Sequence, residues 1–471
     1  MPGNTKGMEL ANKNLLVVGL ARSGLTAANF LIGRGANVTV TDLKSENELS
    51  QILKLLSSPV RLSLGEHRKK DFIEADTIVL SPGVPRSIGP IQKAVSAGVE
   101  VISEVELAYR FLLGVFVGVT GSNGKTTTTT LIGRILQEAR RQHVVAGNIG
   151  TPLTSFIDDP SINQKNTIFV VELSSFQLES IVEFRCQIAL LLNVTPDHMD
   201  RYSDFRAYRT AKGRIFRNQI KDDLAVINAD DSNSQAAASL KRSRTFPFSS
   251  QQTLQQGAFL KDRQLIVSWE GQELRMLTLG DIQLRGEHNL ENVLAASSTA
   301  YLLGVPPAAI AKAVREFPGV EHRLEWVRRY KGVDYYNDSK ATNVESAIRA
   351  IQAFADPLIL IMGGLDKGTD FTPLRTVMSR NVKQVFLLGK ASKKIASTIG
   401  DLVDVVATTD LAEAVDLASR SASSGSIVLL VPACSSFDMF RNYEARGRAF
   451  RELVHALSQS PTEQPERTET R

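Results

Sequence analysis

Residues 115–130 read VFVGVTGSNGKTTTTT, an apolar run that leads through a glycine-rich turn into the start of an amphipathic helix. Glycines in such a turn let backbone N–H groups face phosphate oxygens, and the helix amino terminus adds partial positive charge. Lys125 can reach the β- and γ-phosphates of a nucleotide, and the Thr126 hydroxyl can ligate Mg²⁺. The usual phosphate-binding loop has glycine where this chain has Val119, but the shorter G-x-x-G-K-T core is present. A strand-to-helix turn without a ligand needs neither the lysine nor the hydroxyl, so the stretch predicts phosphate binding.

Short apolar runs recur on both sides of this stretch, and helical patterns such as residues 25–33 and 126–140 lie between many of them. Strands that alternate with helices predict an α/β protein with parallel sheets. The segment from about Phe246 to Asp281 instead alternates polar and apolar residues, which predicts antiparallel ribbons on one domain. Ten apolar runs are typical of buried parallel strands: Leu15–Leu20, Val38–Asp42, Thr77–Pro82, Val115–Thr120, Thr167–Leu173, Ile188–Val194, Leu224–Asn228, Leu358–Met362, Gln384–Leu388 and Ser426–Val431.

The length of 471 residues predicts roughly three domains, at about 150 residues per domain. Changes in the pattern place the boundaries so that the domains span residues 1–104, 105–319 and 320–458. The remaining residues, 459–471, are polar and charged and contain proline, which predicts a disordered tail.

Composition excludes several classes of protein. Hydrophobic residues make up 43% of the chain, enough for packed cores, and the two cysteines lie far apart, which argues against a disulfide framework. The net charge of +5 comes without a basic run interleaved with aromatic residues, so we expect no nucleic-acid partner. Neither a membrane span nor a signal peptide is predicted, and we expect a cytoplasmic protein.

A second glycine-rich turn, VVGLARSG, ends at Gly24, and Asp42 ends the next predicted strand. The turn is similar to a dinucleotide fingerprint, except that Ala21 replaces the middle glycine that allows close approach of a pyrophosphate. Gly19 and Gly24 could equally serve only tight turning and helix packing. The pattern predicts a Rossmann-like sheet whose strand ends accept a nucleotide or its diphosphate.

Three further polar residues follow buried strands of the central region. Alone, Glu172 could be a helix cap, His198 a structural histidine and Lys212 a solvated helix residue. Together with Thr126 they could ligate a divalent metal ion beside a triphosphate, if Lys212 carries an anionic modification. A site with oxygen ligands and few protein groups suits Mg²⁺.

Polar motifs also mark strand ends and helix starts near the carboxyl terminus, where α/β folds place their sites. Simpler interpretations are a capped helix start at Asn289, a surface ion pair at Arg323 and capping by Ser435 or Ser436. Several such turns in one domain nevertheless indicate a binding face. The motifs are HNLEN at 288–292, GVEHRLEW at 319–326, YNDSKATN at 336–343, MGGLDK at 362–367 and VPACSSFDMFRNYEARG at 431–447.

TGSNGKTTT, NDSKATN and the HNxxN box make the chain resemble the Mur ligases, ATP-dependent amide-bond-forming enzymes of peptidoglycan precursor synthesis. Asn123, VELSSFQLE and PACSSFDMFRNYEARG resemble the branch that adds D-glutamate, and the DNPR motif of the diaminopimelate- or lysine-adding branch is absent. The resemblance runs from Gly19 to about Phe450. It implies a Rossmann-like UDP-binding domain, a central ATPase domain and a Rossmann-like C-terminal domain.

The resemblance also implies site residues. Catalytic roles fall on Lys125, His198, Lys212 and Lys340. ATP contacts fall on Gly121, Ser122, Asn123, Gly124, Lys125, Thr126, Thr127, Asn292, Arg323 and Asp338. Mg²⁺ ligands fall on Thr126, Glu172, His198 and a carbamylated Lys212. Substrate contacts fall on Gly19, Asp42, Gly83, Asn148, Thr342, Lys367, Ser436 and Phe437. Leu43 and Lys44 stand at positions where some relatives carry other residues that contact the uracil. The motif GGLDK is spaced differently from the GGDGK of some family members.

On this basis we expect a monomeric ligase that uses ATP and Mg²⁺ to join D-glutamate to UDP-N-acetylmuramoyl-L-alanine through an acyl phosphate. A sister ligase such as folylpolyglutamate synthetase would share the ATPase core, but the UDP-type first domain and PACSSFDMF argue against it. The phosphate-binding motif would also suit a phosphotransferase, a GTPase-like switch or a nucleotide-binding regulator without catalysis. No NKxD guanine motif occurs. Phosphate release that depends on an amine would distinguish a ligase from a phosphotransferase, a GTPase-like switch and a regulator without catalysis.

Overall fold

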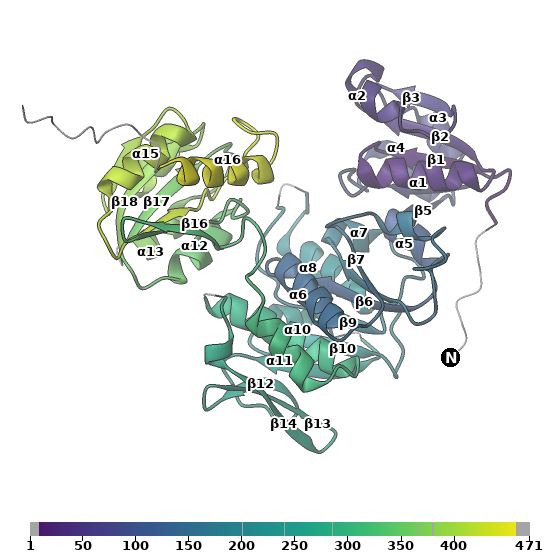
Figure 1. Ribbon diagram of the computed structural model, residues 1–471. Coiled ribbons are helices and arrows are strands. Elements are labelled where there is room, and N and C mark those ends of the chain that lie inside the picture. Colours follow the sequence, from purple (N-terminus) through teal and green to yellow (C-terminus); the bar gives the residue numbers. More distant parts are fainter. Residues whose placement is uncertain are drawn as a thin grey trace, which may run out of the picture. The chain divides into compact units, whose positions relative to one another are not determined.

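A computed structural model describes residues 9–199, 201–239, 241–284, 286–366, 368–378 and 381–457. The predicted tail at 459–471 and the predicted substrate residue Lys367 lie outside the described residues. Three sheets with helices between their strands make up the chain, so the α/β prediction is confirmed (Figure 1). Among the described residues, no helix combines the length and apolar character that a membrane span requires.

The N-terminal sheet is parallel and has the strand order β3-β2-β1-β4-β5. Its central strands are apolar on both faces because helices cover both sides, as expected of a parallel sheet. The strands are β1 (Asn14–Val18), β2 (Asn37–Asp42), β3 (Arg61–Leu64), β4 (Thr77–Leu80) and β5 (Glu100–Ser103). The helices are α1 (Arg22–Gly33), α2 (Glu46–Leu53), α3 (Lys69–Ile73), α4 (Gly89–Ser96) and α5 (Glu104–Tyr109).

The central sheet has nine strands in the order β14-β13-β12-β11-β10-β9-β6-β8-β7. The strands are β6 (Val115–Thr120), β7 (His143–Gly147), β8 (Ile168–Glu172), β9 (Ile188–Leu191), β10 (Leu224–Asn228), β11 (Arg244–Ser249), β12 (Gly257–Lys261), β13 (Gln264–Trp269) and β14 (Gln272–Thr278). The helices are α6 (Lys125–Glu138), α7 (Ser175–Glu179), α8 (Phe205–Gly213), α9 (Ser232–Ala237), α10 (Glu287–Leu302) and α11 (Pro307–Arg315), with 3-10 turns at Leu153–Phe156, Arg214–Phe216 and Leu279–Asp281.

The predicted antiparallel ribbon occurs at β12, β13 and β14, which pair antiparallel. The preceding strand β11 was expected in the same ribbon, but it pairs parallel with both β10 and β12. The ribbon therefore extends the parallel sheet instead of forming a separate layer.

The C-terminal sheet has the order β15-β16-β20-β17-β18-β19. Of the strand pairs that the structure describes in this sheet, only the hairpin of β15 and β16 is antiparallel. The strands are β15 (Glu325–Tyr330), β16 (Val333–Asn337), β17 (Leu358–Gly363), β18 (Val382–Leu388), β19 (Asp404–Ala407) and β20 (Ile427–Leu430). The helices are α12 (Val344–Gln352), α13 (Arg375–Met378), α14 (Ser392–Ile399), α15 (Leu411–Ser421) and α16 (Tyr443–Ala456), with a 3-10 turn at Thr372–Leu374.

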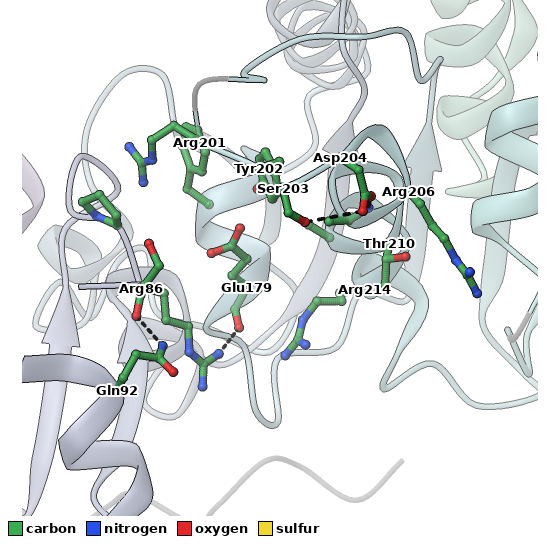
Figure 2. A pocket seen from close by; sticks show the side chains of 15 residues that line it. Arg86, Gln92, Glu179, Arg201, Tyr202, Ser203, Asp204, Arg206, Thr210 and Arg214 are labelled. Atoms are coloured by element: carbon green, nitrogen blue, oxygen red, sulfur yellow. Dashed lines mark hydrogen bonds between the residues drawn. The ribbon is translucent and has the colours of Figure 1, made fainter. Parts of the chain in front are cut away.

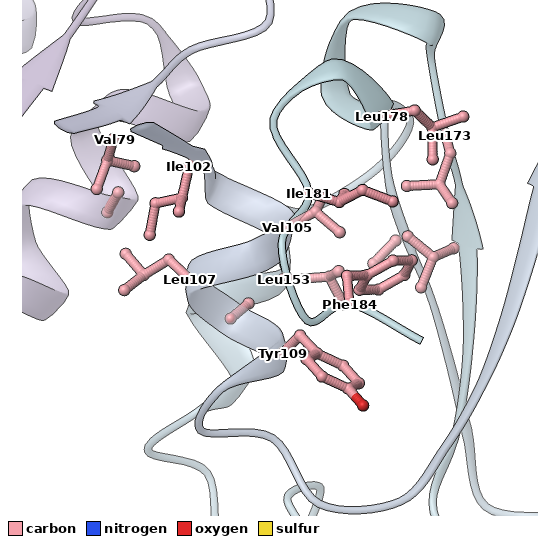
Figure 3. Close-up of a cluster of buried hydrophobic side chains, with 14 of the residues drawn as sticks. Val79, Ile102, Val105, Leu107, Tyr109, Leu153, Leu173, Leu178, Ile181 and Phe184 are labelled. Atoms are coloured by element: carbon pink, nitrogen blue, oxygen red, sulfur yellow. The ribbon is translucent and has the colours of Figure 1, made fainter. Parts of the chain in front are cut away.

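The chain divides into two compact units, Met1–Ile282 with Glu291–Phe317, and Gln283–Leu290 with Pro318–Arg471. The N-terminal and central sheets belong to the same unit because they share one buried apolar cluster. In that cluster Val79 and Ile102 of the N-terminal sheet join Leu153 and Phe184 of the central region (Figure 3). The shared cluster gives the loops of both sheets a common framework.

Candidate active site

The glycine-rich turn between β6 and α6 has the geometry that the sequence predicts. Gly124 has a φ of 84°, and a Cβ atom there would lie 2.1 Å from Asn292 Oδ1. Only glycine fits both the left-handed conformation and the close approach. Helix α6 begins immediately afterwards at Lys125, so its unpaired N–H groups start at the turn. Asn292, a predicted ATP residue, thus lies against the turn, and it also accepts a hydrogen bond from Thr128 Oγ1 at 3.2 Å.

Asn193, which follows β9, holds the turn in place. Its side chain bonds both backbone groups of Asn123: Oδ1 accepts from N at 2.8 Å and Nδ2 donates to O at 3.2 Å. Its carbonyl oxygen accepts from Ser122 N at 2.9 Å. The Ser122 hydroxyl also lies 3.0 Å from Tyr208 Oη. The sequence analysis did not select Asn193, which it placed inside the predicted strand Ile188–Val194, whereas β9 ends at Leu191.

Two lysines converge on the turn. Lys125 Nζ donates to Gly121 O and Ser122 O, both at 2.8 Å, and Lys212 Nζ donates to the same Gly121 O at 2.7 Å. Lys212 is fully buried, and its burial, with the nearby charge of Lys125, lowers the pKa of its amine well below the ordinary value. A neutral amine is the form of lysine that reacts as a nucleophile. Lys212 is therefore not the solvated helix lysine of the simpler interpretation.

Glu172, at the end of β8, has a carboxylate with one satisfied oxygen. Asn148 Nδ2 donates to Oε1 at 2.9 Å, whereas Oε2 is buried without a hydrogen-bond partner. A buried carboxylate oxygen without a donor is rare in native folds and is explained by an ion or water that binds there. Glu172 therefore fits the predicted role of a Mg²⁺ ligand.

His198 lies in the loop after β9 with a φ of 56°, an uncommon conformation for a residue with a side chain. Its ring packs edge-on against Phe176 at a centroid distance of 4.9 Å, and its Nε2 lies 3.6 Å from Asp197 Oδ2. Asp197 also acts electrostatically on Lys212, which makes it a further acidic residue of the site. The sequence analysis selected only its neighbour His198 and missed Asp197.

The predicted metal ligands follow adjacent strands, because β6 pairs parallel with both β8 and β9. Thr126, Glu172 and the loop with His198 therefore belong to one edge of the sheet. Among the described residues, no group of three or more histidines, cysteines and carboxylates forms a metal cluster.

A separate pocket of about 560 Å³ is lined by the four predicted substrate residues Gly19, Asp42, Gly83 and Asn148. The Asp42 carboxylate ties the pocket wall together, because Oδ2 accepts from Leu20 N at 2.7 Å and Oδ1 from Lys44 N at 2.9 Å. Leu43 also lines this pocket and is 66% exposed, so it adds an apolar side chain to the wall. His67, which was not predicted, also lines the pocket. The structure thus brings together residues from the N-terminal sheet and residues from the central sheet.

In the second unit, Asp338 and Lys340 follow β16. Burial raises the pKa of Asp338 to about 7, and the charge of Arg323 opposes this rise. The Lys340 ammonium lies 5.2 Å from the centre of the Tyr443 ring. Thr342 N donates to Lys340 O at 2.8 Å. These residues form a compact polar loop at the carboxyl end of a strand.

The loop after β20 carries the other predicted residues of this unit. Ser436 Oγ is buried without a hydrogen-bond partner, and the Phe437 side chain is 63% exposed. Arg446 of α16 was not predicted, yet it donates to Ser339 O at 2.9 Å and to Cys434 O at 3.2 Å. It is buried and ties the loops after β16 and β20 together.

Three domain families match the chain in sequence order. They are "Mur ligase MurD-like, N-terminal domain" over residues 13–103, "Mur ligase middle domain" over 119–300 and "Mur ligase, glutamate ligase domain" over 322–434.

Curated relatives match nearly the whole chain. The UDP-N-acetylmuramoylalanine–D-glutamate ligase of Geotalea daltonii is 45% identical over 452 residues, which cover 96% of this chain and 99% of the relative. The enzyme of the same name from Acidobacterium capsulatum is 47% identical over 452 residues, which cover 95% and 97%.

Solved structures share the fold at lower identity. The pseudomurein peptide ligase type C of Methanothermus fervidus has a TM-score of 0.59 at 18% identity, and the match covers 94% of this chain and 99% of that one. The MurF ligase of Thermotoga maritima, solved with ADP, has a TM-score of 0.58 at 15% identity, covering 96% and 97%.

The matching domain families, the sequence identity over nearly the whole chain and the shared fold all indicate the same family. The chain belongs to the Mur ligase family, and it is an enzyme. Within the family, the curated relatives named above carry the name of the ligase for UDP-N-acetylmuramoylalanine and D-glutamate.

Proposed function

We propose that this chain is an ATP-dependent ligase that joins the amine of D-glutamate to the carboxylate of UDP-N-acetylmuramoyl-L-alanine. Relatives of this name match from end to end, so substrate and acceptor domains are both included in the similarity. The observation that carries the site assignment is the buried Lys212, whose amine contacts the phosphate-binding turn and lies within electrostatic reach of Glu172.

The reaction needs activation because a carboxylate and an amine do not condense in water. Transfer of the γ-phosphoryl group of ATP to the carboxylate gives an acyl phosphate, which the amine attacks with loss of phosphate. Lys125 lies on the turn, where its charge would stabilise the transferred phosphoryl group. Bound Mg²⁺ would supply further charge neutralisation between the phosphate oxygens. Thr126, Glu172, His198 and Lys212 are the residues that would hold it.

We infer that Lys212 is carbamylated. Its burial beside Lys125 favours the neutral amine, and a neutral amine can add CO₂ to give a carbamate. The product carries an anionic oxygen pair on a long arm, which no encoded side chain of that length provides. It would also replace the repulsion between two lysines by an attraction.

The remaining predicted residues divide among the three substrates. Gly19, Asp42, Gly83 and Asn148 would bind the UDP-muramoyl substrate in their shared pocket. Asn292, Arg323, Asp338 and the turn residues from Gly121 to Thr127 would contact ATP, and Lys340 the acyl phosphate. Thr342, Lys367, Ser436 and Phe437 would position D-glutamate. The reaction would take place in the cytoplasm, and we propose a monomer.

The test is phosphate release from ATP in the presence of UDP-N-acetylmuramoyl-L-alanine and a panel of D- and L-amino acids. We expect release that depends on both substrates and is fastest with D-glutamate. Release that is independent of the amino acid would contradict a ligase, and faster release with another amino acid would contradict the acceptor.

A further inference from the structure

A pocket of about 660 Å³ lies between the loop after β4 and the helices α7 and α8. None of the residues assigned above to ATP, Mg²⁺, D-glutamate or the UDP substrate lines it. Four arginines do, namely Arg86, Arg201, Arg206 and Arg214, against the two carboxylates Glu179 and Asp204 (Figure 2). The pocket therefore carries an excess of positive charge.

Backbone carbonyls at the end of α7, and not carboxylates, hold two of these arginines. The Arg86 guanidinium donates to Glu179 O. Arg214 Nε donates to Leu178 O at 2.8 Å, and its Nη2 donates to Ile181 O at 3.3 Å. Within the part of the chain that the structure describes, none of the four arginines forms an ion pair with a carboxylate. The guanidinium groups of Arg86 and Arg214 are thus held in place by backbone carbonyls, and neither is paired with a carboxylate of the described residues.

Like charges crowd this region. Burial lowers the pKa of Arg86 and of Arg214, the charge of Arg217 lowers both further, and the Glu179 carboxylate opposes the shift only in part. The charge of Arg86 also acts on Arg214. Guanidinium groups that repel one another at fixed positions gain most from an anion placed between them.

The other groups of the pocket leave room for such an anion. The Asp204 carboxylate caps α8 by accepting from Ala207 N at 2.8 Å, so a helix terminus already engages it. The Arg201 guanidinium lies 4.1 Å from the centre of the Phe176 ring, and its Nη1 donates to Gly83 O at 3.4 Å. Thr210 adds a hydroxyl to the wall (Figure 2). Planar guanidinium groups match phosphate oxygens in pairs, and a pocket of this size holds more than one phosphate group.

We propose that this pocket binds a small molecule with two or more phosphate groups, at a site separate from those of ATP and the UDP substrate. The ligand would bridge Arg86, from the N-terminal sheet, to Arg201, Arg206 and Arg214 of the central region. It would contact residues next to His198, because Arg201 N donates to His198 O at 2.9 Å and the Phe176 ring packs against the His198 ring. This inference goes beyond the proposed ligase activity and does not depend on it.

The test uses pyrophosphate as the probe and calorimetric titration as the measurement, on the full chain without metal. None of the substituted residues is assigned to the ATP or UDP sites, so pyrophosphate that binds at those sites contributes equally in every variant. The variants are R206Q and the double variant R86Q/R206Q. R275Q, an exposed arginine of β14 outside the pocket, is the matched control. We expect the double variant to bind pyrophosphate about tenfold more weakly or worse, and R275Q to bind like the wild type.

Equal binding by the wild type and the double variant would overturn the proposal. Binding that needs tens of millimolar anion and is the same for sulfate would mean an adventitious ion only, which overturns it as well. Arg206 is exposed, so R206Q alone keeps the test valid if R86Q disturbs the fold. In that case a weakening of pyrophosphate binding supports the site and an unchanged affinity contradicts it.

Discussion

Single side chains at the turn after β6 carry most of the chemistry, and their contacts separate catalytic from structural roles. Lys125 Nζ bonds to two carbonyls of its own turn, whereas Asn193 joins the turn to the strand beside it. Loss of the lysine should therefore affect phosphate transfer, and loss of the asparagine should affect the shape of the turn.

We expect Lys125→Ala to lower ATP-dependent turnover by about a hundredfold or more while the chain stays folded. In the proposed role the side chain supplies charge at the phosphates, and its amine bonds to two carbonyls of the turn. Steady-state phosphate release checks the first point, and circular dichroism with a thermal melt checks the second. A folded variant with the wild-type rate would contradict the role of the turn.

At Lys212 the sign of the charge should matter more than the length of the side chain. Lys212→Glu should retain more ligase activity than Lys212→Ala, because a carboxylate partly replaces the anionic carbamate. Both variants remove the same buried amine, so each serves as the control for the other. Intact-mass analysis under CO₂-replete conditions should show the added mass in the wild type. An unmodified amine in a fully active enzyme would refute the modification.

Asp338 should make the stability of the second unit depend on pH. Its pKa of about 7 in the fold lies above the value of about 4 in an unfolded chain, so the fold binds the proton more tightly. Stability from this group is therefore present at low pH and is lost as the pH rises from about 4 to 7. The loss is at most about 4 kcal/mol, because each pKa unit corresponds to 1.36 kcal/mol.

Asp338→Asn cannot ionise, so we expect its melting temperature to fall less than that of the wild type between pH 5 and pH 8. Scanning calorimetry at the two pH values provides the measurement, with the transition of the first unit as an internal reference. A parallel fall in wild type and variant would rule out the titration of Asp338 as the cause.

At the scale of the elements, the first glycine-rich turn shows how a strand and a helix are brought into contact. A Cβ on Gly24 would lie 1.9 Å from Gly19 O and 2.8 Å from Ser81 Oγ, so α1 can approach β1 and β4 only with glycine there. The packing role considered for Gly24 from the sequence is therefore real. Gly19 lines the pocket proposed for the UDP substrate, so the same turn would combine packing and binding.

We expect Gly24→Ala to destabilise the first unit by about 1–3 kcal/mol, because α1 must shift away from the sheet. Gly33→Ala in the same helix is the matched control, since a Cβ there meets nothing within 4 Å. It should stabilise the chain slightly, by about 0.4–1 kcal/mol. Thermal melts of the two variants compare these effects. Equal stability of both would contradict the close packing of α1.

At the scale of the whole molecule, the two compact units divide the proposed chemistry. The first contains the glycine-rich turn after β6 and the pocket proposed for the UDP substrate, and the second contains the residues expected to bind the amino acid. Kinetic constants for the different substrates should therefore respond separately to substitutions in the two units.

We expect Lys367→Ala to raise the KM for D-glutamate by about tenfold or more, because a charge-assisted hydrogen bond is worth roughly 1.5–3 kcal/mol. Ser436→Ala should raise the same constant with little loss of stability, since its buried hydroxyl has no protein partner to leave unpaired. The KM for ATP should stay nearly unchanged in both. Steady-state kinetics with each substrate varied in turn gives these constants. A change confined to ATP would place these residues at the nucleotide instead.

L-Glutamate should be a poor acceptor because its amine would point away from the acyl phosphate, and D-glutamine should be poor because it lacks the side-chain charge. Comparable rates with L-glutamate or L-alanine would overturn the acceptor assignment and leave the ligase class standing.

The sequence by itself determined the features that depend on neighbouring residues. Apolar runs such as Val115–Thr120 predicted the strands, and the glycines and Lys125 predicted the phosphate-binding turn, because strand, turn and helix start are contiguous. The short strands β3, β5 and β19 were not predicted, since each begins with a charged residue and forms no continuous apolar run.

Only the tertiary structure decided what depends on residues far apart in the chain. The contact of Lys212 with Gly121, the orphaned oxygen of Glu172 and the arginines gathered from Arg86 to Arg214 are examples. Burial and charge repulsion give these groups their chemistry, and both arise only when the sheets bring distant loops to one edge. A single sequence contains the side chains, but the fold sets the distances and the dielectric surroundings that make them reactive.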